Sequence, residues 1–216
     1  MNHGPHPDQN TQSRGHSNML GSEIEALSFQ IIQQEVSFER YSTSEAEIVA
    51  RVIHASADPV FADTMRFSPN AAEHMIDLIA SKTQVITDVR SLTMSINTVS
   101  TLCAYERGFT PIQGKTRSYA AMYHAVKTFK TNAVYVVGCA PTALEALIEL
   151  SDSMEGPLSI VALPVGYVGA VESKDSLATS NSIYITNTGR RGGTAVTAAV
   201  INAIGKMASG VYSLEH

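Results

Sequence analysis

Two short, continuous runs of apolar residues constrain the fold of this chain most strongly. Residues 133–137 and 158–163 are each long enough for one strand, and they lack the alternating polar residues of a half-solvated strand. The first run ends in a glycine-containing turn, after which a helix begins with proline near its first turn. Strands of this kind are typical of parallel sheets that are covered by helices on both faces, so the chain is predicted to be α/β.

Further strands and helices alternate along the rest of the chain. Additional strands are predicted at residues 84–88, 101–105 and 182–185, which gives five. Predicted helices begin near residues 22, 44 and 141 and cover residues 71–81, 116–130 and 195–207. This alternation without a second glycine-rich half favours a flavodoxin-like, three-layer α/β/α fold with a five-stranded, mainly parallel sheet.

The 216 residues fit one large domain, predicted at 21–212. Residues 1–20 are rich in Asn, His, Ser, Gly and Pro, which is typical of a disordered tail. Its histidines, His3, His6 and His16, could bind a metal, but a solvated tail is the simpler interpretation. The last residues, 213–216, are typical of an expression-tag remnant.

Composition excludes several classes of function. A net charge of −5 argues against nucleic-acid binding. No apolar run approaches the roughly 20 residues that cross a bilayer, and the start lacks the apolar segment of a signal peptide, so we expect a cytoplasmic protein. Neither a phosphate-binding loop nor a dinucleotide fingerprint is present, and Cys103 and Cys139 lack metal-ligand spacing. We therefore expect no bound cofactor and no metal.

Polar and glycine-rich turns follow the predicted strands. In such sheets, ligands bind outside the carboxyl ends of the strands. Helix starts offer free amides to anions, arginines suit carboxylates, and glycines let backbone approach a ligand. Each turn alone could be a plain turn, but together they predict a ligand with several carboxylates or phosphates. The candidate contacts are Asp88, Thr116, Arg117, Gly138, Ala140, Thr142, Gly166, Lys174, Arg191, Gly192 and Gly193.

One histidine, His54, lies in a small, apolar segment at the end of the second predicted helix. Spacing alone favours a packed side chain, and the alternative is a proton carrier near neutral pH. Ser28 falls on the apolar side of the first helix, where its hydroxyl either bonds back to the helix or points into a pocket. Both helices carry capping-box patterns, Ser22 with Glu25 and Ser44 with Glu47.

Several segments match a known family in its order, from about residue 22 to 207. They are IExxSF at 24–29, VIHA at 52–55, FSP at 67–69, TD at 87–88, TRS at 116–118, GxAPTAL at 138–144, LPVGYVGAxESK at 163–174 and GRxGG at 189–193. With these segments the chain resembles precorrin-8X methylmutases, including the cobalt-precorrin-8 enzymes. The segment after Asp88 departs from the family pattern, with Ser95 at a glycine position, and makes Arg90 a further candidate carboxylate contact.

The resemblance implies a flavodoxin-like homodimer that acts on a corrinoid in cobalamin biosynthesis, a branch of tetrapyrrole (porphyrin) metabolism. The implied enzyme is an isomerase that moves a methyl group from C-11 to C-12 by a proton-assisted [1,5]-sigmatropic shift, giving hydrogenobyrinate or cobyrinate. The family's catalytic histidine falls on His54, and its ligand-contacting serine and arginine fall on Ser28 and Arg117. The site is shared across the dimer interface in the family.

Two other functions are compatible with the sequence. A corrinoid-binding carrier would hold the macrocycle without converting it and would have no need of His54. A flavodoxin-like protein that binds flavin would be yellow. Replacement of His54 and the colour of the purified protein therefore distinguish the three interpretations.

Overall fold

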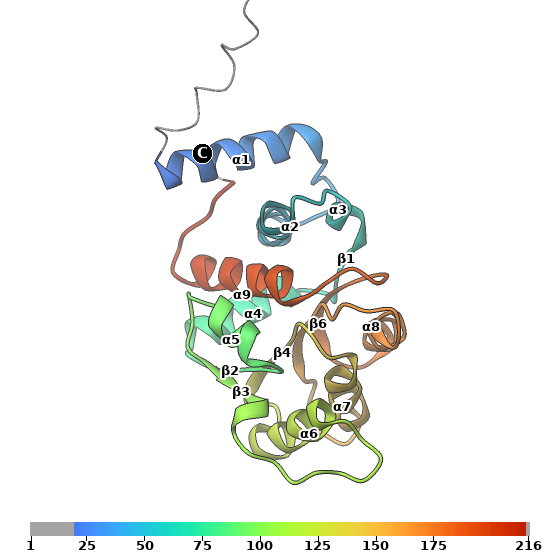
Figure 1. The fold of residues 1–216 in the computed structure, drawn as a ribbon. Coiled ribbons are helices and arrows are strands. Elements are labelled where there is room, and N and C mark those ends of the chain that lie inside the picture. The colour runs from blue at the N-terminus through green and yellow to red at the C-terminus, as the bar shows by residue number, and fades with distance from the viewer. Residues whose placement is uncertain (1–19, 215–216) are drawn as a thin grey trace, which may run out of the picture.

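The structure of the chain is a computed structural model that describes residues 20–214 (Figure 1). The expected tail, apart from Leu20, and its histidines lie outside these residues. One sheet has the strand order β1-β6-β5-β4-β2-β3. Its strands are β1 (Met65–Phe67), β2 (Gln84–Thr87), β3 (Thr101–Cys103), β4 (Ala133–Val137), β5 (Ser159–Ala162) and β6 (Ile183–Asn187).

The five predicted strands are confirmed, and they are parallel to one another in flavodoxin-like order. The predicted number of strands is wrong, because β1 adds a sixth. It pairs antiparallel with β6 along the sheet edge, with Met65 opposite Asn187 and Phe67 opposite Ile185. Three residues are too few to give a readable alternation of apolar and polar side chains, so the sequence did not predict β1.

Helices cover both faces of the sheet, and the predicted α/β/α arrangement is confirmed (Figure 1). The helices are α1 (Gly21–Glu35), α2 (Thr43–Ser56), α3 (Phe61–Thr64), α4 (Ala71–Ala80), α5 (Arg90–Ser95), α6 (Arg117–Phe129), α7 (Pro141–Ser151), α8 (Ala170–Thr179), α9 (Thr194–Ala208) and the short 3-10 helix η1 (Ala104–Glu106). Of these, α4 and α9 pack in the core on one face, and α6 and α7 pack on the other.

Two helices add layers outside this sandwich. Helix α2 packs on α9, and α1 lies over α2 at the far end of the molecule (Figure 1). Helix α9 is buried on nearly all sides, because it lies between the sheet and α2. Its alanines Ala198, Ala199 and Ala203 let α2 approach closely, and Ile48, Val49 and Val52 of α2 are fully buried.

Both predicted capping boxes are wrong. The N-cap of α2 is Ser42, two residues earlier than predicted: Ser42 accepts from the Glu45 amide at 3.3 Å, and Glu45 accepts from the Ser42 amide at 3.0 Å. In α1, Glu23 accepts from the Leu20 amide at 2.8 Å. The acids assigned to the boxes, Glu25 and Glu47, are therefore free to make contacts outside their own helices.

After α9, residues 209–214 return to the α1–α2 layer (Figure 1). The buried Glu47 carboxylate accepts from the Ser213 amide at 2.9 Å and the Leu214 amide at 3.0 Å. Ser213 also accepts from Arg51. Between residues 20 and 214, the structure contains no helix that is long and apolar enough to span a bilayer.

Candidate functional site

His54 lies on the last turn of α2, where its side chain is exposed at the surface. The prediction from spacing, that the His54 side chain is packed inside the protein, is therefore wrong. Ser28 Oγ lies 2.8 Å from His54 Nδ1, and the Phe29 ring stacks on the imidazole with centroids 5.2 Å apart. When Ser28 donates to Nδ1, the imidazole proton is on Nε2. Ser28 and Phe29 of α1 thus fix the orientation of the ring.

Three charged side chains from three helices surround this pair. Glu25 Oε1 on α1 accepts from Arg51 on α2 and from Lys206 Nζ on α9, the latter at 3.3 Å. Arg51 also lies over the face of Phe29, 4.6 Å from its centroid. The Arg51 and Lys206 charges lower the pKa of the Glu25 carboxyl and outweigh the opposing effect of its burial.

The pKa of His54 lies below its usual value of 6.5. Partial burial is the main cause, because it disfavours the charged ring, and the positive charges of Arg51 and Lys206 act in the same direction. The Glu25 carboxylate opposes them. The free imidazole is therefore mostly neutral at pH 7, and its protonated form is a stronger acid than an ordinary histidine.

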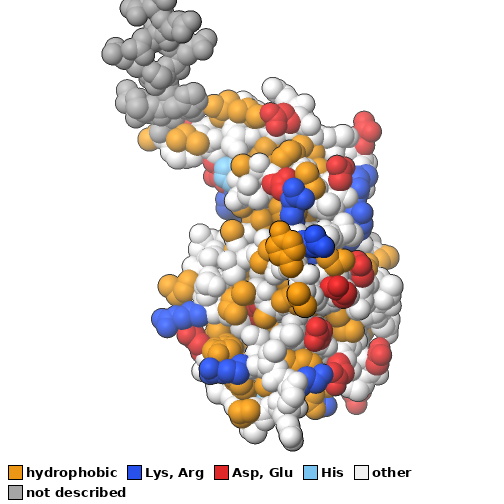
Figure 2. All heavy atoms as spheres, turned by 45° about the vertical axis from the view of Figure 1, so that its right-hand side comes forward, with side chains coloured by type: hydrophobic (Ala, Val, Ile, Leu, Met, Phe, Trp, Pro, Cys, Tyr) orange, Lys and Arg blue, Asp and Glu red, His pale blue; other side chains and the backbone are white. Residues whose placement is uncertain are grey.

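His54 lines two cavities of different character. The first, of about 370 Å³, lies between α1 and α2 and has apolar walls that include Ile24, Leu27 and Ile53, with Ser28 at its edge. The second, of about 420 Å³, lies between α1, α2, α5 and α9 and contains the charged groups Glu25, Arg51 and Lys206. Figure 2 shows hydrophobic side chains gathered on the α1 layer and a hollow in the surface below it.

The turn after β4 was expected to offer amides to an anion, but Asp88 already binds them. Its buried carboxylate accepts from Gly138 N at 3.2 Å, and from Cys139 N and Ala140 N at 2.9 Å each. Burial raises the pKa of Asp88, and the three amides oppose that rise. This turn lies at the point where the strand order reverses, the usual ligand crevice of such sheets. Here the chain itself fills the anion position.

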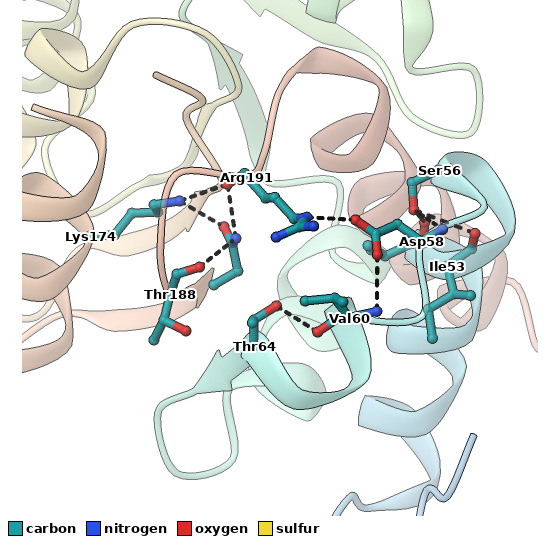
Figure 3. A network of polar contacts seen from close by, with 10 residues as sticks. Ile53, Ser56, Asp58, Val60, Thr64, Lys174, Thr188 and Arg191 are labelled. Atoms are coloured by element: carbon teal, nitrogen blue, oxygen red, sulfur yellow. Dashed lines mark hydrogen bonds and ion pairs between the residues drawn. The ribbon is translucent and has the colours of Figure 1, made fainter. Parts of the chain in front are cut away.

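The loop after β6 is held from inside the protein. Lys174 is buried on α8 and donates to Arg191 O at 2.8 Å and to Asn187 Oδ1 at 3.2 Å. Burial lowers the pKa of Lys174 to about 8. Arg191 Nε in turn donates to Asp58 Oδ2 at 2.7 Å, beyond the end of α2. Figure 3 shows Arg191 between Lys174 and Asp58. This network connects the loop to the segment that follows His54.

Two glycines allow this loop to approach the end of β5. A Cβ on Gly192 would meet Leu163 O at 2.1 Å, which no side chain can do, and Gly193 donates to the same oxygen at 2.7 Å. Gly166 donates to Arg190 O at 3.2 Å and joins the loops after β5 and β6. The Arg190 guanidinium stacks over the exposed Tyr167 ring at 5.1 Å.

Another group of candidate residues lies on the opposite face of the sheet from α2. Thr116 and Thr142 place their Oγ1 atoms 2.7 Å apart, at the starts of α6 and α7. Arg117 is exposed and lies over the Tyr105 ring, 4.8 Å from its centroid. Since α6 and α2 belong to different faces, one chain does not bring Arg117 and His54 together (Figure 1). Arg90 pairs with Glu106 at 3.4 Å.

Sequence reasoning missed Glu25, Arg51 and Lys206 as site residues. A signal existed for two of them. Glu25 lies three residues before Ser28, and Arg51 lies three residues before His54, so each shares a helix face with a candidate residue. Lys206 has no such neighbour in the sequence. In the part of the chain that the structure describes, no three His, Cys, Asp or Glu side chains are grouped as a metal site would require.

Comparisons with known proteins agree on one family. The family model for precorrin-8X methylmutase matches residues 23–207. The cobalt-precorrin-8 methylmutase of Priestia megaterium is 36% identical over 202 residues, which cover 88% of this chain and 89% of that protein. The precorrin-8X methylmutase of Pseudomonas aeruginosa is 33% identical over 198 residues, which cover 85% and 94%.

A solved structure is similar over the same region. The crystal structure of the precorrin-8X methylmutase from Thermus thermophilus superposes with a TM-score of 0.79 at 29% identity. The match covers 87% of this chain and 98% of that one.

Proposed function

This chain belongs to the precorrin-8X methylmutase family, and we propose that His54 is the group through which it acts. The enzyme is an isomerase of cobalamin biosynthesis that moves a methyl group from C-11 to C-12 of its corrinoid precursor, precorrin-8X or the cobalt-containing counterpart. The carbon–methyl bond at C-11 breaks as the bond at C-12 forms, so atoms and electrons balance within one molecule.

In the proposed mechanism, His54 lends a proton to the conjugated ring system and recovers it after the shift. The observation that carries this proposal is the Ser28–His54 contact, at 2.8 Å, between two exposed cavities. It holds Nδ1 and leaves Nε2 to face the substrate. Because the pKa of His54 is lowered, its protonated form gives up the proton readily. A positioned acid of this kind contributes about 10²–10⁴ in rate.

The remaining candidates divide into contacts and supports. We assign substrate contacts to Ser28, Thr116, Arg117 and Thr142. Supporting roles fall to residues that bind other parts of the chain, namely Asp88, Gly138, Ala140, Gly166, Lys174, Arg191, Gly192 and Gly193. A homodimer would let Arg117 of one subunit and His54 of the other contact one substrate, which a single chain does not allow. The single domain at 21–212 and the cytoplasmic location stay predictions.

The decisive experiment replaces His54 and follows turnover and binding separately. We expect His54→Ala to lower kcat by about 10²–10⁴-fold while hydrogenobyrinic acid still binds in an absorbance titration. His74→Ala is a matched control, because His74 Nε2 also contacts a serine. It lies 2.9 Å from Ser159 Oγ, between α4 and β5. Its kcat should match that of the wild type. Unchanged turnover in His54→Ala, or parallel loss of turnover and binding, would contradict the proposal.

A further inference from the structure

We propose that Lys206 binds a peripheral carboxylate of the corrinoid in the second cavity, and that Glu25 occupies Lys206 until the substrate arrives. The inference rests on the proposed function, because it takes the polycarboxylate substrate from there. It adds a substrate-binding residue on α9, a helix to which no substrate contact has been assigned so far.

The second cavity suits a carboxylate arm of the macrocycle. Its volume of about 420 Å³ lies within the usual range of roughly 300–1,000 Å³ for small-molecule sites. Alanines of α9, Ala195, Ala198 and Ala199, form an apolar wall, and three charged side chains from α1, α2 and α9 also line the cavity. His54 belongs to this cavity and to the apolar one, so an arm in the second cavity would leave the ring edge next to the imidazole.

The two cations of the cavity differ in how firmly they are held. Arg51 donates to Glu25 and Ser213, stacks over Phe29, and its side chain is 11% exposed. Among the residues that the structure describes, Lys206 has a single ion pair, with Glu25 at 3.3 Å, and its side chain is 34% exposed. Lys206 can therefore move to a ligand without breaking other contacts between described residues. Arg51 cannot.

Glu25 acts as an internal substitute for the ligand. Its Oε1 atom accepts from both cations, so the pair of positive charges shares one carboxylate. When a substrate carboxylate takes Lys206, Arg51 keeps Glu25, and no charge is left unpaired in the cavity. The exchange brings one more negative charge close to His54, where it favours the protonated ring that the reaction uses.

The test compares hydrogenobyrinic acid with the same compound after methyl esterification of its peripheral carboxyls. We expect Lys206→Met to weaken binding of the free acid by about tenfold and to leave binding of the ester unchanged. Lys206→Arg, which keeps the charge, should stay within about threefold of the wild type for both compounds. In turnover, Lys206→Met should raise KM and change kcat little.

Lys127→Met is the control for the loss of one positive charge, because Lys127 is exposed on the last turn of α6, on the other face of the sheet. It should bind both compounds like the wild type. If Lys206→Met binds the free acid as tightly as the wild type, or weakens acid and ester equally, the inference is wrong. That result leaves the proposed function intact as long as His54→Ala still loses turnover. If the wild type binds neither compound, the proposed function fails as well.

Discussion

At the scale of single residues, the chemistry of His54 is set by side chains from three helices. Ser28 on α1 holds Nδ1, Arg51 on α2 lies one turn away, and Lys206 on α9 completes the group through Glu25. His54 and Ser28 were found from the sequence through the family's motifs. Lys206 was not, because it lies 181 residues from Glu25 in the chain and the contact exists only after α1, α2 and α9 have packed.

These charges predict a specific pH dependence. If protonated His54 is the proton donor, kcat/KM should fall as the pH rises, with an apparent pKa below 6.5, since burial and Arg51 disfavour the charged ring. Lys206→Met removes a positive charge and should move this pKa upward. Glu25→Gln removes a negative charge and should move it downward. Steady-state kinetics from pH 5 to 8 check both shifts, and shifts in one common direction would contradict the assignment of the donor.

At the scale of elements, the turn between β4 and α7 depends on Asp88. The strands and most helix positions could be predicted, because buried runs, turn residues and apolar periodicity are local signals. The direction of the Asp88 side chain could not, since its three amide partners lie 50 to 52 residues later in the chain. The same amides were therefore assigned to an outside anion. The start of α2 was misplaced because two Ser–Glu spacings compete there. The start of α1 was misplaced because its N-cap is Leu20, whose side chain gives no capping signal.

Removal of the Asp88 carboxylate should expose this dependence. We expect Asp88→Ala to lower the free energy of unfolding by about 3 kcal/mol, because three amides at the edge of the core lose their acceptor. Formate, a small carboxylate, should restore part of the loss in urea denaturation. Asp77→Ala, at an exposed position on α4, should show neither effect. Equal responses of the two variants to formate would mean that the rescue is a general salt effect.

At the scale of the whole molecule, the candidate contacts lie on two faces of one sheet. His54 belongs to the layers outside α9, whereas Arg117 and the Thr116–Thr142 pair lie on the α6–α7 side. The sequence predicted the α/β/α architecture correctly. It did not predict this separation, because all the strand-end turns were expected at one edge of the sheet. The layers that α1 and α2 form outside α9 were not expected.

A shared site predicts complementation between inactive variants. His54→Ala and Arg117→Ala should each lose most activity, and a mixture that is dissociated and reassociated should recover activity in about a quarter of its sites. Such sites combine His54 of one subunit with Arg117 of the other. Sedimentation should give a mass of twice 23.1 kDa for each variant. A mixture that stays inactive although mixed dimers form would contradict the shared site.

The carboxylate of Asp88 in the crevice of the sheet has a consequence for engineering. Since the position where related architectures hold a ligand is filled from within, the strand-end turn beside it is a poor target for changing what this enzyme accepts. Substitutions in that turn would disturb the contacts with Asp88 that hold the fold. Directed evolution toward altered macrocycles should instead randomise exposed side chains that line the cavities, such as Ile24 and Ile31 of α1.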